Sequence, residues 1–283
     1  MATRNNKLAV NKTQIAVISG SVVLIVLLLF ANTKPPKKDS KTEMSDHAGT
    51  NSANVSTLLE GAKNALSVDQ KQTFTKLEDA LITSSDKKKD FENIISFWDS
   101  LKQPAIAAYY LEQVAIASPT EKNWNEAGKR YYAATRFVNA SEKPILYNKA
   151  IECFEKTIAL NPKNTEAKIN LGACYVEGSA NPMKGIGILR EVEKTDSNNV
   201  NLQLNFAFFS EKSGQWDKAI ARFKKVLLIQ PDFVEAYLHL ADAYEQKGDK
   251  TKAIESLEKY SSLVDDVSIK TEIRNYINKL SKG

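Results

Sequence analysis

The sequence predicts an all-α protein in which pairs of helices repeat along most of the chain. Two observations predict this class. Small residues recur at a nearly constant spacing within an apolar helical pattern, and no segment shows the apolar–polar alternation of a strand. A third observation, an uncharged apolar run near the start, adds a membrane helix. Of the 283 residues, 42% are apolar and 26% are charged, which is typical of a folded chain.

Residues 1–13 form a basic tail, and residues 14–33 predict a transmembrane helix. No charged residue lies between Lys12 and Lys34, and a helix of about 20 residues spans the roughly 30 Å hydrocarbon core of a bilayer. A cleaved secretory signal is the alternative. The run is long for such a signal, and Leu29 stands two residues before Ala31, where signal peptidase prefers a small residue. We therefore expect a retained anchor.

The short basic tail also predicts the orientation of this anchor. A short amino-terminal segment ahead of a single span usually stays in the cytoplasm, although Lys and Arg residues are nearly balanced across the span. We expect a single-pass protein of the plasma (inner) membrane in a bacterial cell envelope, with the bulk of the chain on the exoplasmic or periplasmic side. The opposite orientation stays open.

Residues 34–53 predict a flexible linker, and residues 54–87 predict two helices. The linker contains Pro35, Pro36 and many polar residues but almost no large apolar one, so it buries too little surface to offset its chain entropy. An apolar helical stripe then begins at Val55. Ser67 with Gln70 predicts a capping box ahead of the second helix.

The repeat is visible in five small residues: Ala107, Ala150, Gly185, Ala219 and Ala253. A large apolar residue follows each of them by four positions, and in three units a proline follows by twelve. These positions share one helical face that the proline ends, which indicates the second helix of a hairpin. The residues expected to pack the hairpins together are Trp124, Gly128, Tyr131, Ala150, Phe154, Leu171, Gly172, Tyr175, Ala219, Phe223, Leu240 and Ala253.

This pattern resembles the tetratricopeptide repeat family, whose units combine W-x2-L-G-x2-Y on the first helix with A-x3-F-x2-A and then P on the second. Residues 165–199, 200–233 and 234–265 match with near-regular spacing. Residues 121–164 match with about nine extra residues, which we expect in a lengthened first helix and loop. Residues 88–120 form a degenerate unit. Residues 266–283 predict a half-polar capping helix, which a solenoid needs at its end.

The resemblance implies a groove, lined by the first helices, that binds peptides or proteins. The sixth position of each unit usually faces this groove, and a row of asparagine amides there can pair with an extended peptide backbone of any sequence. Ordinary surface asparagines are the alternative in this Asn-rich chain. The candidate groove residues are Asn170, Asn205 and His239 at sixth positions, with Phe208, Glu235 and Asp242 beside them.

The carboxylate clamp by which some members of the family grip a chaperone's carboxyl-terminal tail is absent from this sequence. The clamp needs Lys, Arg and Asn at positions that hold Ile169, Ala173, Glu235 and His239 here. A co-chaperone role of the cytosolic heat-shock type is therefore disfavoured.

Charge and composition exclude other classes of function. The formal net charge is +5, to which residues 1–33 contribute a net charge of +3 and residues 34–50 a net charge of +1. Residues 51–283 are therefore nearly neutral. A nucleic-acid partner needs a concentrated basic face, and we expect none. The two histidines and the absence of catalytic or zinc-binding motifs predict no enzymatic activity, metal or cofactor. We expect Cys153 and Cys174 to be unbridged apolar residues, with a disulfide as the alternative.

The sequence therefore predicts a non-enzymatic, membrane-anchored adaptor that binds other proteins or extended protein segments. Its layout is similar to the single-span repeat subunits that accompany bacterial secretion translocons and periplasmic chaperones. Two alternatives stay open. One is a structural scaffold for an envelope or cytochrome-maturation complex, acting by self-association or outside the groove. The other is a regulatory arm of a separate enzyme. The sequence leaves homo-oligomer formation undecided.

Overall fold

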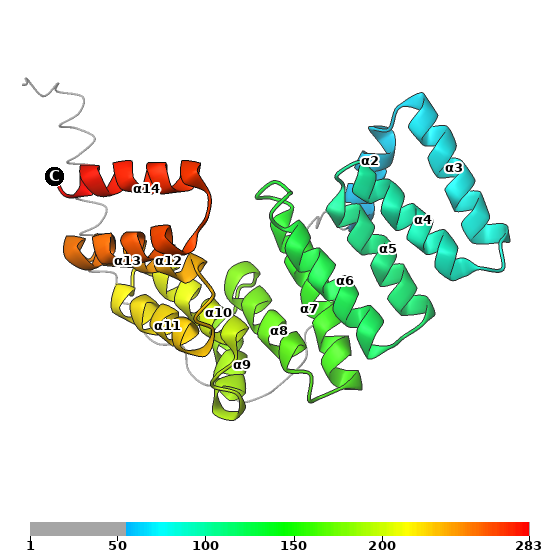
Figure 1. The fold of residues 1–283 in the computed structure, drawn as a ribbon. Helices are drawn as coiled ribbons and strands as arrows, with labels where there is room; N and C mark the ends of the chain where they lie inside the picture. The colour runs from blue at the N-terminus through cyan, green and yellow to red at the C-terminus, as the bar shows by residue number, and fades with distance from the viewer. Residues whose placement is uncertain (1–54, 283) are drawn as a thin grey trace, which may run out of the picture. The chain divides into compact units, whose positions relative to one another are not determined.

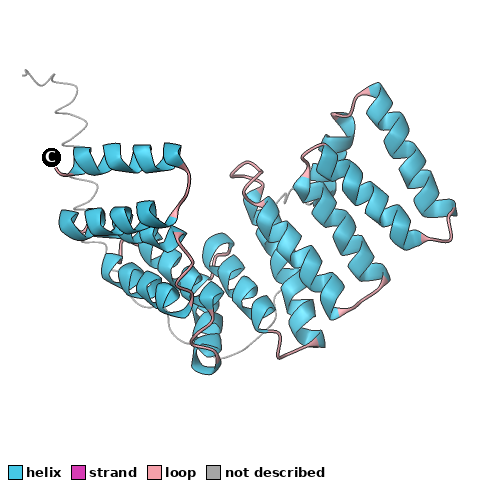
Figure 2. Cartoon of the chain, viewed as in Figure 1, coloured by secondary structure: helices cyan, strands magenta, loops and turns pink. Residues whose placement is uncertain are grey.

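The computed structural model describes residues 55–282, and within this range every regular element is a helix (Figure 2). The expected all-α class is confirmed here, with thirteen helices and no strand among the described residues. Their bounds are α2 Val55–Asn64, α3 Val68–Thr83, α4 Lys87–Ser100, α5 Pro104–Ala117, α6 Glu121–Ala134, α7 Lys143–Leu160, α8 Thr165–Gly178, α9 Pro182–Thr195, α10 Val200–Lys212, α11 Trp216–Ile229, α12 Glu235–Gln246, α13 Lys250–Leu263 and α14 Val267–Leu280.

Consecutive helices form hairpins, and each hairpin packs on its neighbours in the chain (Figure 1). The hairpins are α4–α5, α6–α7, α8–α9, α10–α11 and α12–α13. Helices α2 and α3 pack on α5 and α4, and α14 packs on α13. Buried apolar residues form successive clusters that each join only neighbouring helices. This arrangement is a helical solenoid, in which every unit buries its apolar face against the next one.

The repeated small residues lie inside this stack, as the sequence predicts. The four alanines of the set are fully buried, and Gly185 is buried as well. Most of the other predicted packing residues are also buried, namely Trp124, Gly128, Tyr131, Phe154, Leu171, Gly172, Phe223 and Leu240, whereas Tyr175 is half-buried. Small side chains let two helices approach closely, and the larger ones fill the space beside them.

Local sequence determines where the helices begin and end. The predicted capping box is confirmed: the Ser67 hydroxyl accepts a hydrogen bond from the Gln70 amide at 3.3 Å, and the Gln70 side chain accepts one from the Ser67 amide at 2.9 Å. Prolines in the first turn begin α5, α7 and α9, where the missing amide proton costs nothing. Gly214 and Gly248 have φ of +69° and +78° in two hairpin turns, a conformation that favours glycine.

The longer unit, residues 121–164, differs from the expectation in one respect. Its first helix, α6, has 14 residues, as α8 does, so the predicted lengthening of the first helix is wrong. The extra residues instead form the loop 135–142 and extend the second helix, α7, to 18 residues. Pro144 explains the difference, because proline is well suited to the first turn of a helix and starts α7 early.

The predictions for the two ends of the chain have different outcomes. The predicted tail (1–13), transmembrane helix (14–33) and linker (34–53) lie outside the described residues. Within residues 55–282, no helix combines the length and the apolar character needed to cross a bilayer. At the carboxyl end, α14 places Leu280 against the last core cluster, but it buries no residue fully and leaves Val267 75% exposed. The capping helix therefore covers the last unit loosely.

Candidate functional site

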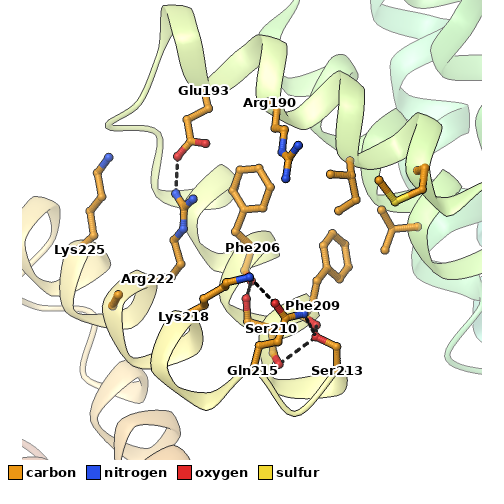
Figure 3. Close-up of a pocket in the computed structure, with 14 residues that line it drawn as sticks. Arg190, Glu193, Phe206, Phe209, Ser210, Ser213, Gln215, Lys218, Arg222 and Lys225 are labelled. Atoms are coloured by element: carbon orange, nitrogen blue, oxygen red, sulfur yellow. Dashed lines mark hydrogen bonds and ion pairs between the residues drawn. The ribbon is translucent and has the colours of Figure 1, made fainter.

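A pocket of about 750 Å³ lies where one hairpin meets the next, between α9, α10 and α11 (Figure 3). We call it the α9–α10 joint pocket. Smaller pockets lie at two equivalent joints. The α7–α8 joint pocket measures about 410 Å³ and is also lined by α9, and the α11–α12 joint pocket measures about 380 Å³ and is also lined by α13. All three open between the second helices of consecutive units.

One position of the repeat explains the size of the α9–α10 joint pocket. Eight residues after the small residue, three other units hold Ala115, Ile158 and Leu227, which belong to or pack against the apolar clusters of their joints. In α9 the same position holds Glu193, and a charged side chain is costly to bury against an apolar helix. Helices α9 and α10 accordingly pack more sparsely than α7 with α8 or α11 with α12. The pocket at this joint is accordingly larger than those at the joints that carry Ile158 and Leu227.

Arg222 of α11 neutralises Glu193 across the pocket. Its Nη1 donates to the Glu193 carboxylate and, at 2.7 Å, to Gln203 Oε1, and its guanidinium lies 4.6 Å from the Phe206 ring centroid (Figure 3). The hydrogen bond from Arg222 lowers the pKa of Glu193, which keeps the carboxylate ionised at neutral pH. Both side chains remain partly exposed, so the ion pair adds little stability to the joint.

The other cations leave the pocket with an excess of positive charge. Four cationic side chains line it, and Glu193 is the one carboxylate among the lining residues. Lys218 Nζ lies 2.5 Å from Gln215 Oε1. Arg190 and Lys225 have no hydrogen bond or ion pair with any residue in the described range, and Arg190 extends toward the side on which Phe206 and Phe209 lie (Figure 3). Two cations are therefore available to a ligand.

Apolar side chains supply the remaining surface of the pocket. Phe206 and Phe209 of α10 face it together with Met183 and Ile186 of α9. Met183 is 67% exposed, so its side chain is open to a ligand. The pocket thus combines aromatic and aliphatic contacts with an excess of positive charge.

The candidate groove residues lie elsewhere, on the first helices, and none of the six lines this pocket. Asn170 of α8 and Asn205 of α10 are both half-buried. The Asn205 side-chain amide donates to the Asn201 carbonyl of its own helix at 2.8 Å. An intrahelical bond of this kind competes with the peptide pairing expected of an asparagine row.

His239 and Phe208 are brought together, whereas the two candidate acids remain at the surface. The His239 ring stacks on Phe223 with centroids 4.9 Å apart, and it meets the Phe208 ring edge-on at 5.0 Å. Its Nδ1 lies 3.5 Å from Glu211 Oε1. Glu235 and Asp242 are exposed. This cluster occupies the joint between α10 and α12, and it fixes His239 by packing on aromatic rings.

Two positions of the carboxylate clamp are apolar and inaccessible in the structure. Ile169 is 2% exposed and Ala173 is fully buried, so neither position offers a surface to a ligand. Within residues 55–282, no group of three or more His, Cys, Asp or Glu side chains is placed to hold a metal ion.

Cys153 and Cys174 are free and buried, in agreement with the favoured interpretation that they are unbridged. Burial raises the pKa of the Cys153 thiol to about 12 and raises that of Cys174 as well. We expect neither thiol of the native chain to react with Ellman's reagent at about pH 8, and both to react after denaturation, because the thiolate is the reactive form. Labelling of the native chain at either site would show that α7 and α8 separate.

The same shift gives the sign of a pH effect on stability. An unfolded thiol ionises near its ordinary pKa of about 8.5, whereas the folded Cys153 thiol stays protonated up to about pH 12. The contribution of Cys153 to stability is therefore complete below about pH 8 and falls as the pH rises above it. Denaturation midpoints of the native chain and a Cys153→Ala variant across this range measure the effect.

Comparison with known proteins agrees with this architecture. A family model described as TPR repeat matches residues 212–248, and one described as Tetratricopeptide repeat matches residues 234–263. Residues 212–263 therefore contain tetratricopeptide repeats. A search of curated protein sequences found no match.

Solved structures share the fold of these repeats. A tetratricopeptide repeat protein from Parabacteroides merdae ATCC 43184 is 14% identical with a TM-score of 0.52, covering 80% of this chain and 86% of that one. PilW, a type IV pilus biogenesis factor, is 20% identical with a TM-score of 0.51, covering 70% and 88%.

One residue position in the sequence indicates the α9–α10 joint pocket, although it is not part of the family motif. The family pattern covers the small, large apolar and proline positions, and it does not include the position eight residues after the small residue. There the five units hold Ala115, Ile158, Glu193, Leu227 and Ser261, so Glu193 is the one charged residue of the series. A charged residue at a position that its neighbours use for packing indicates an open joint.

Proposed function

We propose that the chain is a non-enzymatic adaptor, anchored in the plasma membrane by residues 14–33, that captures segments of other proteins on its tetratricopeptide repeats. The α9–α10 joint pocket carries the proposal, since it is a preformed apolar and cationic surface with Met183 67% exposed. A preformed surface lowers the entropy cost of capture. An anchor followed by a linker keeps that surface at high local concentration beside the partners of the membrane.

The expected orientation places the repeats on the exoplasmic or periplasmic side. The short basic tail before the apolar run supports this side. Protease added to cells whose outer barrier has been opened is expected to remove the repeats and leave the tail protected. Protection of the repeats would place them in the cytoplasm.

Site-specific photo-crosslinking in washed membranes tests the proposed function. The full chain carries the crosslinking residue at Met183 in the joint pocket, at Asn205 on the first-helix face, or at Phe137 in the α6–α7 loop. We expect the chain to stay in the membrane pellet after alkaline extraction and to form a defined product with another protein from Met183. Phe137 is the control, because it is 72% exposed and lies outside the joint pocket.

The remaining outcomes separate the alternatives. Products at none of the three positions, or the same products at all of them, would reject capture by the repeats. A product between two copies of the chain would favour a self-associating scaffold. If capture survives the change of both Asn170 and Asn205 to alanine, the asparagine row on the first helices is not the binding surface.

A further inference from the structure

We propose that the α9–α10 joint pocket binds an acidic and apolar segment of a partner protein, in which Glu or Asp residues stand beside bulky apolar ones. This inference rests on the proposed function and adds the chemistry of the captured segment. It also places the contact between the second helices of consecutive units, away from the candidate groove on the first helices.

The unpaired cations argue for carboxylates in the bound segment. Arg222 is occupied by Glu193 and Gln203, whereas Arg190 and Lys225 have no hydrogen bond or ion pair in the described part of the chain, and the Lys225 charge acts on Glu193 from a longer distance. A guanidinium accepts a carboxylate through two parallel hydrogen bonds, which gives Arg190 both energy and geometric selectivity. The ligand chemistry that satisfies the pocket is therefore anionic.

The aromatic and aliphatic surface argues for bulky side chains next to those carboxylates. Phe206 and Phe209 lie on the side toward which Arg190 extends, and Met183 and Ile186 of α9 complete the apolar part of the lining (Figure 3). Burying an apolar side chain on this surface removes apolar area from water and so favours binding. A purely acidic segment would leave this contribution unused.

The neighbouring joints argue for an extended occupant. The three joint pockets are lined at equivalent repeat positions: Ile158, Glu193 and Leu227 on one second helix, and Glu191, Lys225 and Lys259 on the next. A small molecule would occupy a single pocket. An extended segment can contact several successive pockets, so equivalent linings at three joints favour a segment. Positive charge continues into the α11–α12 joint pocket, which Lys224 and Lys259 line together with Glu255 and with Lys252, whose charge Asp249 neutralises at 2.7 Å. The acidic part of the segment is therefore expected to run toward α13.

Charge also favours a protein segment over a nucleic acid. Nucleic-acid binding depends on many cations that displace counterions from successive phosphates. Here the α9–α10 joint pocket has only four cations, Arg222 is paired with Glu193, and this ion pair and Phe206 lie between Lys225 and Arg190 (Figure 3). Residues 51–283 as a whole carry almost no net charge. The surface matches carboxylates spaced along a mixed segment better than a continuous phosphate backbone.

Fluorescence anisotropy with defined peptides tests the proposal on the full chain in detergent micelles. Three labelled peptides of equal length are compared: one alternates Glu and Leu, one alternates Gln and Leu, and one alternates Glu and Ser. We expect the Glu–Leu peptide to bind at least tenfold tighter than either of the others, with an affinity that falls as salt rises. A single-stranded oligonucleotide of similar charge serves as competitor and is expected not to displace the peptide.

Matched variants locate the site. Changing Arg190 and Lys225 together to glutamine is expected to weaken the Glu–Leu peptide tenfold or more. Met183→Glu, an exposed change in the same pocket, is expected to do the same. Lys194→Gln is the control: it removes a positive charge from the same helix, but Lys194 is 68% exposed, pairs with Glu191 and does not line the α9–α10 joint pocket. Circular dichroism checks that each variant is folded.

Several results would overturn the proposal: equal binding of the Glu–Leu and Gln–Leu peptides, equal effects of the pocket variants and of Lys194→Gln, or displacement by the oligonucleotide. They leave the proposed function standing if photo-crosslinking in membranes still captures a partner protein. Conversely, the absence of any crosslinked partner would reject the proposed function, whatever the peptides do.

Discussion

Replacing Gly185 with alanine is expected to destabilise the folded chain by about 1–3 kcal/mol, whereas the same change two residues later, at Gly187, is expected to stabilise it. A Cβ atom at Gly185 would meet the Gly172 carbonyl oxygen and the Tyr175 and Val176 side chains, all at under 3.0 Å. The carbonyl belongs to the α8 backbone and cannot rotate away, so α8 and α9 would have to separate. At Gly187, a Cβ atom would have no neighbour within 4 Å.

The two positions form a matched pair, because both glycines lie inside α9 and both changes improve helix propensity by about 1 kcal/mol. Any difference between the variants therefore reports the contact between α8 and α9. Urea denaturation followed by circular dichroism measures it. Equal midpoints for Gly185→Ala and Gly187→Ala would mean that α8 and α9 do not approach through Gly172 and Gly185.

The hairpins were predictable because their packing depends on residues at fixed spacing. Ala150, Ala219 and Ala253 mark the contact between the two helices of a unit, and each is followed four positions later by a buried Phe or Leu. Small and large side chains must alternate in this way for helices to pack closely, so the spacing in the sequence already contains the geometry. Gly185 belongs to the same series, but how closely α8 and α9 approach there is seen only in the structure.

The joints between hairpins were less predictable, because they depend on pairs of residues from different units. Glu193 looks like an ordinary surface residue of an amphipathic helix until Arg222, Gln203 and Phe206 are placed around it. The first-helix residues have the expected repeat positions but not the expected contacts. Asn205 has the right repeat position for a ligand contact, yet its amide is turned onto its own backbone. Repeat position gives the face of a helix, and it does not give the partner of a side chain.

Replacing Lys149 with methionine is expected to destabilise the chain by about 2–4 kcal/mol, since it removes the cation that neutralises a buried carboxylate. Glu112 of α5 is 4% exposed. It lies 3.0 Å from Lys149 Nζ of α7 and accepts a hydrogen bond from the Tyr131 hydroxyl of α6 at 2.6 Å. Burial lowers the pKa of Lys149, but the hydrogen bonds and charges of Glu112 and of Glu152, which lies 3.2 Å from Lys149 Nζ, together outweigh that effect and raise it. The ion pair therefore stabilises the fold below the ordinary lysine pKa of about 10.4, and this stability is lost as the pH rises through the higher pKa of the folded state.

A double-mutant cycle with Glu112→Gln separates the buried charge from the loss of packing. Glutamine keeps an acceptor for Tyr131 and needs no counterion, so adding Glu112→Gln to Lys149→Met is expected to recover much of the lost stability. Urea midpoints of the two single variants and the double variant measure the coupling. Lys194→Met is the control for removing a lysine, with an expected change within about 0.5 kcal/mol because its side chain is 68% exposed. Strict additivity of the two changes would mean that the Glu112 charge does not need Lys149, and that this ion pair does not hold α5 and α7 together.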